Sequence, residues 1–283
     1  SKTYSHDAQI ADSAATATAI ISGVKTGART LGLSQTVKYG NCASHEGAET
    51  QSLFVLAEEQ GLATGVVSTA RITHATPAST YAMSASRNWE DNTFIKGAEE
   101  DCPDIARQLI EWNHGDGFEI VMGGGRRHFM TTDQADPEYA DKSGRRTDGR
   151  DLLSEWATKS DAHVYAFDQA GFDALDFASN ARVMALFEPS HMNYEVDRAD
   201  DGAGEPSLAE LTEAAITRLS RDEDGFVLMV EGGRVDHGHH AGNAARALGD
   251  AVALDDAVAK ALEMTSAEDT LIIVTADHSH TMT

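Results

Sequence analysis

The stretch Phe226–His240 reads FVLMVEGGRVDHGHH, and it indicates both the fold class and the chemistry of the chain. Its first five residues form an apolar run of strand length, and two glycines follow after Glu231, which is typical of a buried strand. Glu231 closes this run, Asp236 lies five positions further on, and His240 follows after four more. Carboxylates and imidazoles are ligands that suit zinc and related divalent ions. The stretch therefore predicts a metal site after a buried strand, with a solvated His-rich loop as the alternative.

Four other runs of the same kind predict further buried strands, at Thr64–Ser68, Glu119–Met122, Val183–Phe187 and Leu271–Thr275. Helical patterns lie between them, with apolar residues three or four positions apart in Ser207–Arg221 and Ala241–Met264. The small-residue segment Ser13–Val24 predicts another helix, with Asp12 or Ser13 at its N-terminus. Strands that alternate with helices indicate an α/β fold, namely a three-layer α/β/α sandwich around a largely parallel sheet.

Length and charge narrow the class of protein. A chain of 283 residues suffices for one large α/β domain or two small ones. No apolar stretch approaches the roughly 20 residues of a membrane span. The 46 acidic and 22 basic residues give a net charge of −24, which argues against a nucleic acid-binding surface and is typical of a protein kept soluble in high salt. An anionic substrate would need local positive charge, which bound metal ions supply.

Polar, reactive side chains follow three of the predicted strands, in Thr69–Thr76, Glu231–His240 and Asp277–His280. Ligands of open parallel sheets bind at the carboxyl ends of the strands, so we expect these segments to share one edge. Five of the twelve histidines fall in the last two segments. Two metal ions that hold the attacking and leaving oxygens of a displacement are the simplest explanation.

The segment from Asp12 to Ala19, DSAATATA, places a serine at a predicted helix start. By base rate such a serine is an N-cap. A helix N-terminus also favours a serine alkoxide and a bound phosphate. Coordination of the serine oxygen to a metal would make a general base unnecessary.

Six motifs in order give the chain a resemblance to the alkaline phosphatases, closest to the animal and marine-bacterial branch, over essentially all 283 residues. The motifs are DSAATATA, VSTARITHATPAST, VMGGGRR, LFEP, VEGGRVDHGHH and VTADHSH. The resemblance implies a phosphomonoester hydrolase of broad substrate range and alkaline pH optimum that acts through a phosphoserine intermediate.

Residue by residue, the resemblance implies that Ser13 is the nucleophile and that Arg87 holds the phosphate oxygens. It implies two zinc ions and one magnesium ion, whose ligands match Asp236 and His240, Asp277 and His278, and Thr76 and Glu231, respectively. His74 and His237 stand where another branch has Asp and Lys, and we expect them to tune phosphate and water rather than bind zinc. For His239 and His280 we expect an indirect or structural role.

The animal-type branch also carries a calcium site, and the matching positions lie in the 131–206 region with its acidic insert loops. They are Glu138, Phe187 through its carbonyl, Glu188 and Glu205, with surface carboxylates that bind no ion as the alternative. The two cysteines, Cys42 and Cys102, could by composition be free thiols or a disulfide, and the resemblance implies the disulfide. A disulfide implies an oxidising compartment, so we expect a periplasmic or secreted protein.

The family pattern begins before Ser1 and continues after Thr283, so we expect 1–283 to be a partial catalytic domain. An upstream Asp and a downstream His would complete the zinc sites, and the chain alone is expected to bind zinc weakly. The resemblance also implies a homodimer for the full-length protein. Two alternatives stay open: a phosphodiesterase or sulfatase on the related scaffold, and a truncated, non-catalytic protein that binds metal or phosphate.

Overall fold

The computed structural model describes residues 4–97 and 102–281, and the chain divides into two units. Unit 1 consists of Ser1–Gly61, Thr73–Gly117 and Arg127–Glu155. Unit 2 consists of Leu62–Ile72, Phe118–Arg126 and Trp156–Thr283.

Unit 2 is built on a five-stranded sheet in the order β3-β4-β2-β1-β5, and all of its strand pairs are parallel. The strands are β1 (Ala63–Arg71), β2 (Ile120–Gly124), β3 (His163–Ala166), β4 (Arg182–Leu186) and β5 (Phe226–Glu231). Four of them confirm strands that the sequence predicts, and the fold is α/β as expected. The fifth, β3, lies at the edge of the sheet and was not predicted.

The register of the two strands β1 and β5 brings their carboxyl ends together. Val67 pairs with Val230, and Ser68 pairs with Glu231. The Ser68 hydroxyl donates a hydrogen bond to the Glu231 carboxylate. Two polar side chains therefore meet where these strands leave the apolar core.

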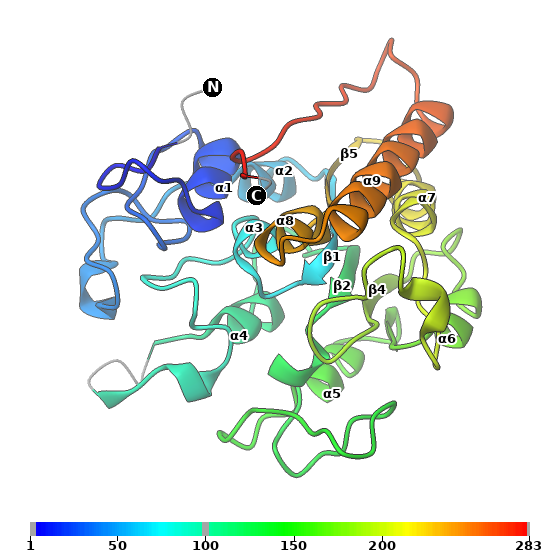
Figure 1. The fold of residues 1–283 in the computed structure, drawn as a ribbon, viewed down its shortest axis with the longest axis horizontal. Helices are drawn as coiled ribbons and strands as arrows, with labels where there is room; N and C mark the ends of the chain where they lie inside the picture. The colour runs from blue at the N-terminus through cyan, green and yellow to red at the C-terminus, as the bar shows by residue number, and fades with distance from the viewer. Residues whose placement is uncertain (1–3, 98–101, 282–283) are drawn as a thin grey trace. The chain divides into compact units, whose positions relative to one another are not determined.

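Helices flank this sheet, namely α6 (Gln169–Asp173), α7 (Leu208–Leu219), α8 (Arg234–His240) and α9 (Ala244–Met264), together with the 3-10 turn η5 (Arg198–Asp200). Helix α7 packs closely on β1, because a Cβ atom added at Gly65 would lie 2.8 Å from Leu219 Cδ1. Helices α7 and α9 lie side by side (Figure 1), and Lys260 Nζ is 3.2 Å from Glu213 Oε2 between them.

Two predicted elements differ from the structure. Leu271–Thr275 forms no strand, and Leu271 and Ile273 are 83% and 75% exposed. An apolar run becomes a strand only where a neighbouring strand accepts its backbone hydrogen bonds, and among the described residues this run has no strand partner. The segment after β5, whose alternative reading was a loop, is helix α8, and α9 begins at Ala244 rather than at Ala241 because the Asn243 side chain caps it.

Unit 1 contains α1 (Ser13–Ser22), α2 (Leu53–Glu59), α3 (Ala75–Ala78) and α4 (Ile105–Ile110), with the 3-10 turns η1 (Cys42–Ser44) and η2 (Asn92–Phe94). The turn η4 (Arg126–His128) and helix α5 (Leu152–Ala157) run across the unit boundaries of the chain. Helix α1 packs against α2 and α3, and its residues Ala14–Thr18 are buried.

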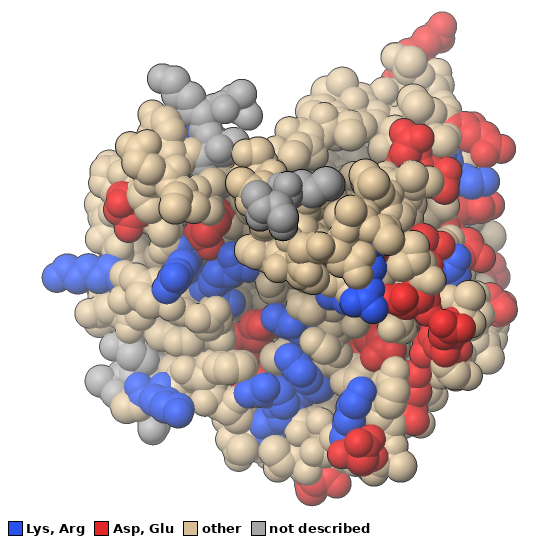
Figure 2. All heavy atoms as spheres, in the orientation of Figure 1, with Lys and Arg blue, Asp and Glu red and all other residues tan. Residues whose placement is uncertain are grey.

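Charge is unevenly distributed on the surface. On the face drawn in Figure 2, Asp and Glu gather along the right-hand edge, and exposed acidic residues of α7 and α9 include Glu210, Glu213, Asp255, Asp256 and Glu263. In the ranges 4–97 and 102–281, no helix is long and apolar enough to cross a membrane.

Candidate active site

Ser13 is the first residue of helix α1, and the residue before it caps that helix. The carboxylate of Asp12 accepts hydrogen bonds from the backbone N–H groups of Ala14 and Ala15, at 3.4 and 3.3 Å. Because Asp12 takes the N-cap role, the reading of Ser13 as the cap is wrong. The side chain of Ser13 instead lies at a half-buried helix N-terminus, where the dipole favours negative charge.

The Asp12 carboxylate also holds a guanidinium in place. Asp12 Oδ2 lies 2.9 Å from Arg87 Nη1, and Asp12 Oδ1 accepts the backbone N–H of Arg29 at 2.7 Å. Arg87 Nη2 lies 3.1 Å from His74 Nε2. For Arg87 to donate here, Nε2 must be unprotonated, which places the proton of a neutral His74 on Nδ1. Unit 1 thus brings together three predicted site residues, Ser13, Arg87 and His74, around one carboxylate.

The loop that carries Arg87 is fixed on two sides. Its backbone N–H donates to the carbonyl of Arg29 at 2.8 Å. Beside it, Ala85, Trp89, Ile95 and Cys102 form a small buried cluster, against which Cys42 packs. Cys42 and Cys102 are joined by a disulfide, which confirms the pairing that the resemblance implies. The fourth predicted residue of this unit, Thr76, lies in α3, the helix that packs against α1.

In unit 2 two of the metal-binding candidates, Asp236 and His240, lie together with His280. Asp236 and His240 lie four residues apart on α8, so they face the same side, and His240 Nε2 is 3.4 Å from Asp236 Oδ2. His280 Nε2 lies 3.9 Å from Asp236 Oδ1, and one ligand atom from each of the three residues lies within 4.8 Å of the others. Asp236 Oδ1 is buried and has no hydrogen-bond partner among the described residues. A buried carboxylate oxygen beside two imidazoles fits a zinc-type ion.

The other predicted zinc ligands, Asp277 and His278, lie beside each other in the segment after α9. His278 Nε2 is 3.5 Å from Asp277 Oδ2, and the His278 N–H donates to Asp277 Oδ1 at 2.9 Å. The structure also brings His280, for which no metal was predicted, next to Asp236 and His240. His239 lies 2.8 Å from the carbonyl of Val235 through Nδ1, and its indirect or structural role stays a prediction.

Several residues that sequence reasoning missed surround His237. Its Nδ1 lies 3.1 Å from Arg234 Nη1, and its ring centre lies 4.1 Å from that of His191. His191 Nε2 in turn is 2.6 Å from Arg71 Nη1. Arg71 ends β1 and His191 follows β4, so the only sequence signal for them is their place after strands.

The calcium candidates of unit 2 include one unusual carboxyl group. Glu205 is only 2% exposed, and its Oε2 has no hydrogen-bond partner among the described residues. Burial, with the neighbouring charges of Glu188 and Asp201, raises the pKa of Glu205 to about 8, although hydrogen bonds from Asn193 act against this.

The other calcium candidates differ in their partners. The Phe187 carbonyl already accepts a hydrogen bond from Arg126 Nη1 at 2.6 Å. In unit 1, Glu138 lies in a loop where its backbone N–H donates to Asp136 at 3.1 Å. Sequence reasoning missed Asp201 and Asn193, which both lie in the segment between β4 and α7.

Unit 2 has a parallel sheet with carboxylates and imidazoles after its strands, and unit 1 has a serine at a helix start beside an arginine that Asp12 holds. Each of these features is typical of metal-dependent α/β hydrolases. The family model for alkaline phosphatase matches residues 1–283, and the chain belongs to the alkaline phosphatase family.

Individual proteins that are similar to the chain are alkaline phosphatases too. The chain is 43% identical to the tissue-nonspecific isozyme of alkaline phosphatase from Gallus gallus and covers 55% of its length. It is 41% identical to the membrane-bound alkaline phosphatase of Bombyx mori and covers 52% of it. The chain thus spans about half the length of these relatives.

Solved structures of the family match over most of the chain. The alkaline phosphatase of Thermus thermophilus aligns with a TM-score of 0.71 and 34% identity, over 92% of this chain and 46% of that one. The enzyme of the Antarctic bacterium TAB5 aligns with a TM-score of 0.68 and 29% identity, over 93% and 63%. A variant of that enzyme, in which glutamate replaces a histidine, has magnesium bound in a site called M3.

Proposed function

We propose that this chain carries the nucleophile, the phosphate clamp and metal ligands of a phosphomonoester hydrolase with broad substrate range and an alkaline optimum. The observation that carries the proposal is the arrangement of Ser13 at the start of α1 with Arg87 held by Asp12 and His74. A guanidinium has five N–H donors, so Arg87 keeps donors for phosphate oxygens while it pairs with Asp12 and His74.

In this proposal Ser13 attacks the phosphorus of the substrate, its P–O bond forms as the bond to the leaving alcohol breaks, and water later cleaves the phosphoserine. The positive end of the α1 dipole and the Arg87 guanidinium stabilise the charge of the transferring phosphoryl group. His74 and His237 orient phosphate and water. The chain is thus transiently a phosphoprotein.

The residues that would hold metal ions are those of the resemblance, with one addition. Asp236 and His240, with His280 beside them, fit one zinc ion; Asp277 and His278 would bind a second; Thr76 and Glu231 would bind magnesium. Bound divalent ions would lower the pKa of the nucleophile and neutralise charge on the leaving oxygen. The buried Glu205, with Glu188, Glu138 and the Phe187 carbonyl, is the candidate calcium site, because a cation would compensate its carboxylate.

The decisive experiment is the substitution Ser13→Ala in the complete, metal-loaded protein. Hydrolysis of p-nitrophenyl phosphate should fall by about three orders of magnitude or more, since the covalent route is lost. Quenching the wild type in acid with labelled phosphate should trap phosphoserine at Ser13, and the variant should trap none. Undiminished turnover of the variant would remove Ser13 from this role.

Rates on a monoester, a diester and a sulfate ester separate the proposal from its alternatives. We expect the monoester to be preferred, because Arg87 and the helix start match a dianion. Equal or better turnover of the diester or the sulfate would favour the related hydrolases instead, and binding of phosphate without any turnover would favour a non-catalytic protein.

The proposal also covers the location, the oligomeric state and the salt tolerance of the protein. The Cys42–Cys102 disulfide supports a periplasmic or secreted location. The full-length protein is proposed to be a homodimer, which sedimentation would test, and its acidic surface is proposed to confer salt tolerance.

A further inference from the structure

Glu90 is a buried carboxylate in the loop that carries Arg87, and it has none of the roles proposed above. Glu90 follows Arg87 by three residues and is 7% exposed. Its Oε2 accepts a hydrogen bond at 2.7 Å from the hydroxyl of Thr73, which is fully buried. Thr73 directly precedes His74, so this one hydrogen bond joins the loop that supplies Arg87 to the loop that supplies His74.

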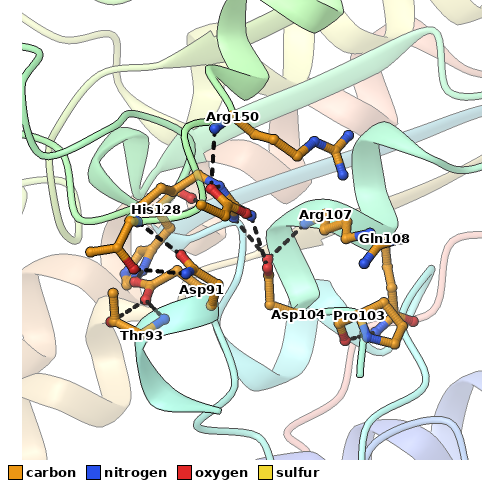
Figure 3. A network of polar contacts seen from close by, with 12 residues as sticks. Asp91, Thr93, Pro103, Asp104, Arg107, Gln108, His128 and Arg150 are labelled. Carbon is orange, nitrogen blue, oxygen red and sulfur yellow. Dashed lines mark hydrogen bonds and ion pairs between the residues drawn. The ribbon is translucent and has the colours of Figure 1, made fainter. Parts of the chain in front are cut away.

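The same oxygen of Glu90 also lies beside a buried histidine. His128 is fully buried, with Nε2 3.4 Å from Glu90 Oε2 and 3.3 Å from Arg127 Nε. Its Nδ1 lies 2.6 Å from Asp91 Oδ2, as Figure 3 shows. Burial alone would raise the pKa of Asp91, but His128 and Thr93 outweigh this and hold that pKa below its usual value. Asp91 is therefore ionised and keeps the imidazole in one orientation.

A second group of ion pairs fixes the same region to helix α4. Arg146 forms a fork with Asp104, both contacts at 3.0 Å, and its Nη1 lies 3.3 Å from the carbonyl of His128. Asp104 caps α4 by accepting the N–H of Arg107 at 2.8 Å (Figure 3). The arrangement is rigid because Asp104 and the Arg146 side chain are almost fully buried.

The backbone of the Arg87 loop uses the same helix. The carbonyls of Trp89 and Glu90 accept the N–H groups of Ile105 and Ala106, at 2.8 and 3.2 Å. The main chain of residues 89–90 is thus held by α4, and the side chain of Glu90 connects that anchored segment to Thr73.

We infer that Glu90 is a positioning residue: by receiving the Thr73 hydrogen bond, it sets the distance between His74 and Arg87 and so aligns the guanidinium for phosphate. The inference rests on the proposed role of Arg87. A buried carboxylate has a large desolvation cost, and in a purely structural place an apolar side chain would serve as well. Small displacements of a positioning group reduce turnover strongly, which gives such a carboxylate a function.

The test removes the hydrogen bond without changing the charge. In the complete, metal-loaded protein, Thr73→Val should raise the inhibition constant of inorganic phosphate and lower kcat/KM by about 10-fold each. Thr73→Ser keeps the hydroxyl and should stay within about 2-fold of the wild type. Thr212→Val removes a buried hydroxyl of α7 in unit 2, and should leave both constants unchanged.

A double-mutant cycle separates positioning from general damage. If Glu90 and Thr73 act through Arg87, Thr73→Val should have no further effect on phosphate inhibition in an Arg87→Ala protein. Glu90→Leu, which removes the acceptor of the Thr73 hydrogen bond at similar size, should show the same dependence and covers the case that Thr73→Val does not fold.

Three results would overturn the inference. An equal loss from Thr73→Val with and without Arg87 would mean that the pair does not act through the guanidinium. A loss in Thr73→Ser as large as in Thr73→Val would mean that the hydroxyl is irrelevant. Arg87→Ala with unchanged phosphate inhibition would instead refute the proposed clamp, and with it the inference.

Discussion

Asp12 combines two functions in one side chain. It caps α1 through the N–H groups of Ala14 and Ala15, and it pairs with Arg87. Asn caps helices about as well as Asp, whereas Ala does not. Substitutions at this residue can therefore separate the stability of the helix from the orientation of the guanidinium.

We predict that Asp12→Asn keeps the melting temperature near that of the wild type but raises KM for a phosphomonoester. Asp12→Ala should raise KM as well and should also cost about 1 kcal/mol of stability, because the cap is lost. Thermal and urea denaturation measure the stability of the two variants, and steady-state kinetics measures their KM. Equal KM values in Asp12→Asn and the wild type would contradict the pairing.

A second residue-scale prediction concerns Asp250, a 3% exposed carboxyl group on α9. Burial raises its pKa to about 6, against the backbone hydrogen bond from Glu195 and the charge of Arg234. In the unfolded chain the pKa is about 4, so the unfolded state releases this proton first as the pH rises. The contribution of Asp250 to the free energy of unfolding therefore falls between about pH 4 and pH 6.

Asp250→Asn removes this loss. Below about pH 4 the variant and the wild type should be equally stable, and above about pH 6 the variant should be more stable by on the order of 2 kcal/mol. Urea midpoints from pH 3.5 to 8 give the curve. Asp255→Asn, an exposed substitution on the same helix, is the control and should show no such rise.

At the scale of elements, the end of β2 depends on a glycine. A Cβ atom added at Gly124 would lie 2.1 Å from the carbonyl oxygen of Ser190, in the segment after β4. Only a residue without a Cβ atom lets the end of β2 come this close to the Ser190 backbone. This explains one glycine of the VMGGGRR motif in physical terms.

Gly124→Ala should therefore destabilise the protein by about 3 kcal/mol, in the upper part of the range for overpacking, because the contact is with backbone. Thermal unfolding measures this. Gly202→Ala is the matched control, since a Cβ atom there meets nothing within 4 Å. A similar melting temperature for the two variants would show that the Ser190 segment moves away easily.

Local sequence patterns predicted some of the helices and strands correctly and others not. The strands β1, β2, β4 and β5 and helix α7 were predictable, because long apolar runs and regular spacing are local signals. The edge strand His163–Ala166 was missed, since only its pairing with β4 distinguishes it from a loop. The run Leu271–Thr275 was predicted as a strand for its composition alone, but composition supplies no hydrogen-bonding neighbour.

For the whole molecule, the net charge of −24 is the dominant electrostatic property. Salt shortens the Debye length from about 30 Å at 0.01 M to about 3 Å at 1 M, and this reduces the repulsion among the carboxylates. We predict that the free energy of unfolding rises by on the order of 1–2 kcal/mol from 0.05 to 1 M NaCl, which is several degrees in melting temperature.

A variant with fewer acidic residues provides the control. Replacing Glu210, Glu213, Asp255, Asp256 and Glu263 by their amides should reduce the increment that salt produces, because these exposed carboxylates lie on neighbouring helices. An unchanged increment would mean that salt acts through apolar surface instead.

The sequence by itself determined the α/β class, most of the strands, the serine at a helix start and the candidate metal ligands. These follow from local patterns and from motifs whose residues are near in the chain. The tertiary structure decided which groups meet: Asp12 with Arg87, His280 with Asp236, and Glu90 with Thr73 and His128. The reason is that such contacts join segments far apart in the chain, and only the packing of those segments sets their distances.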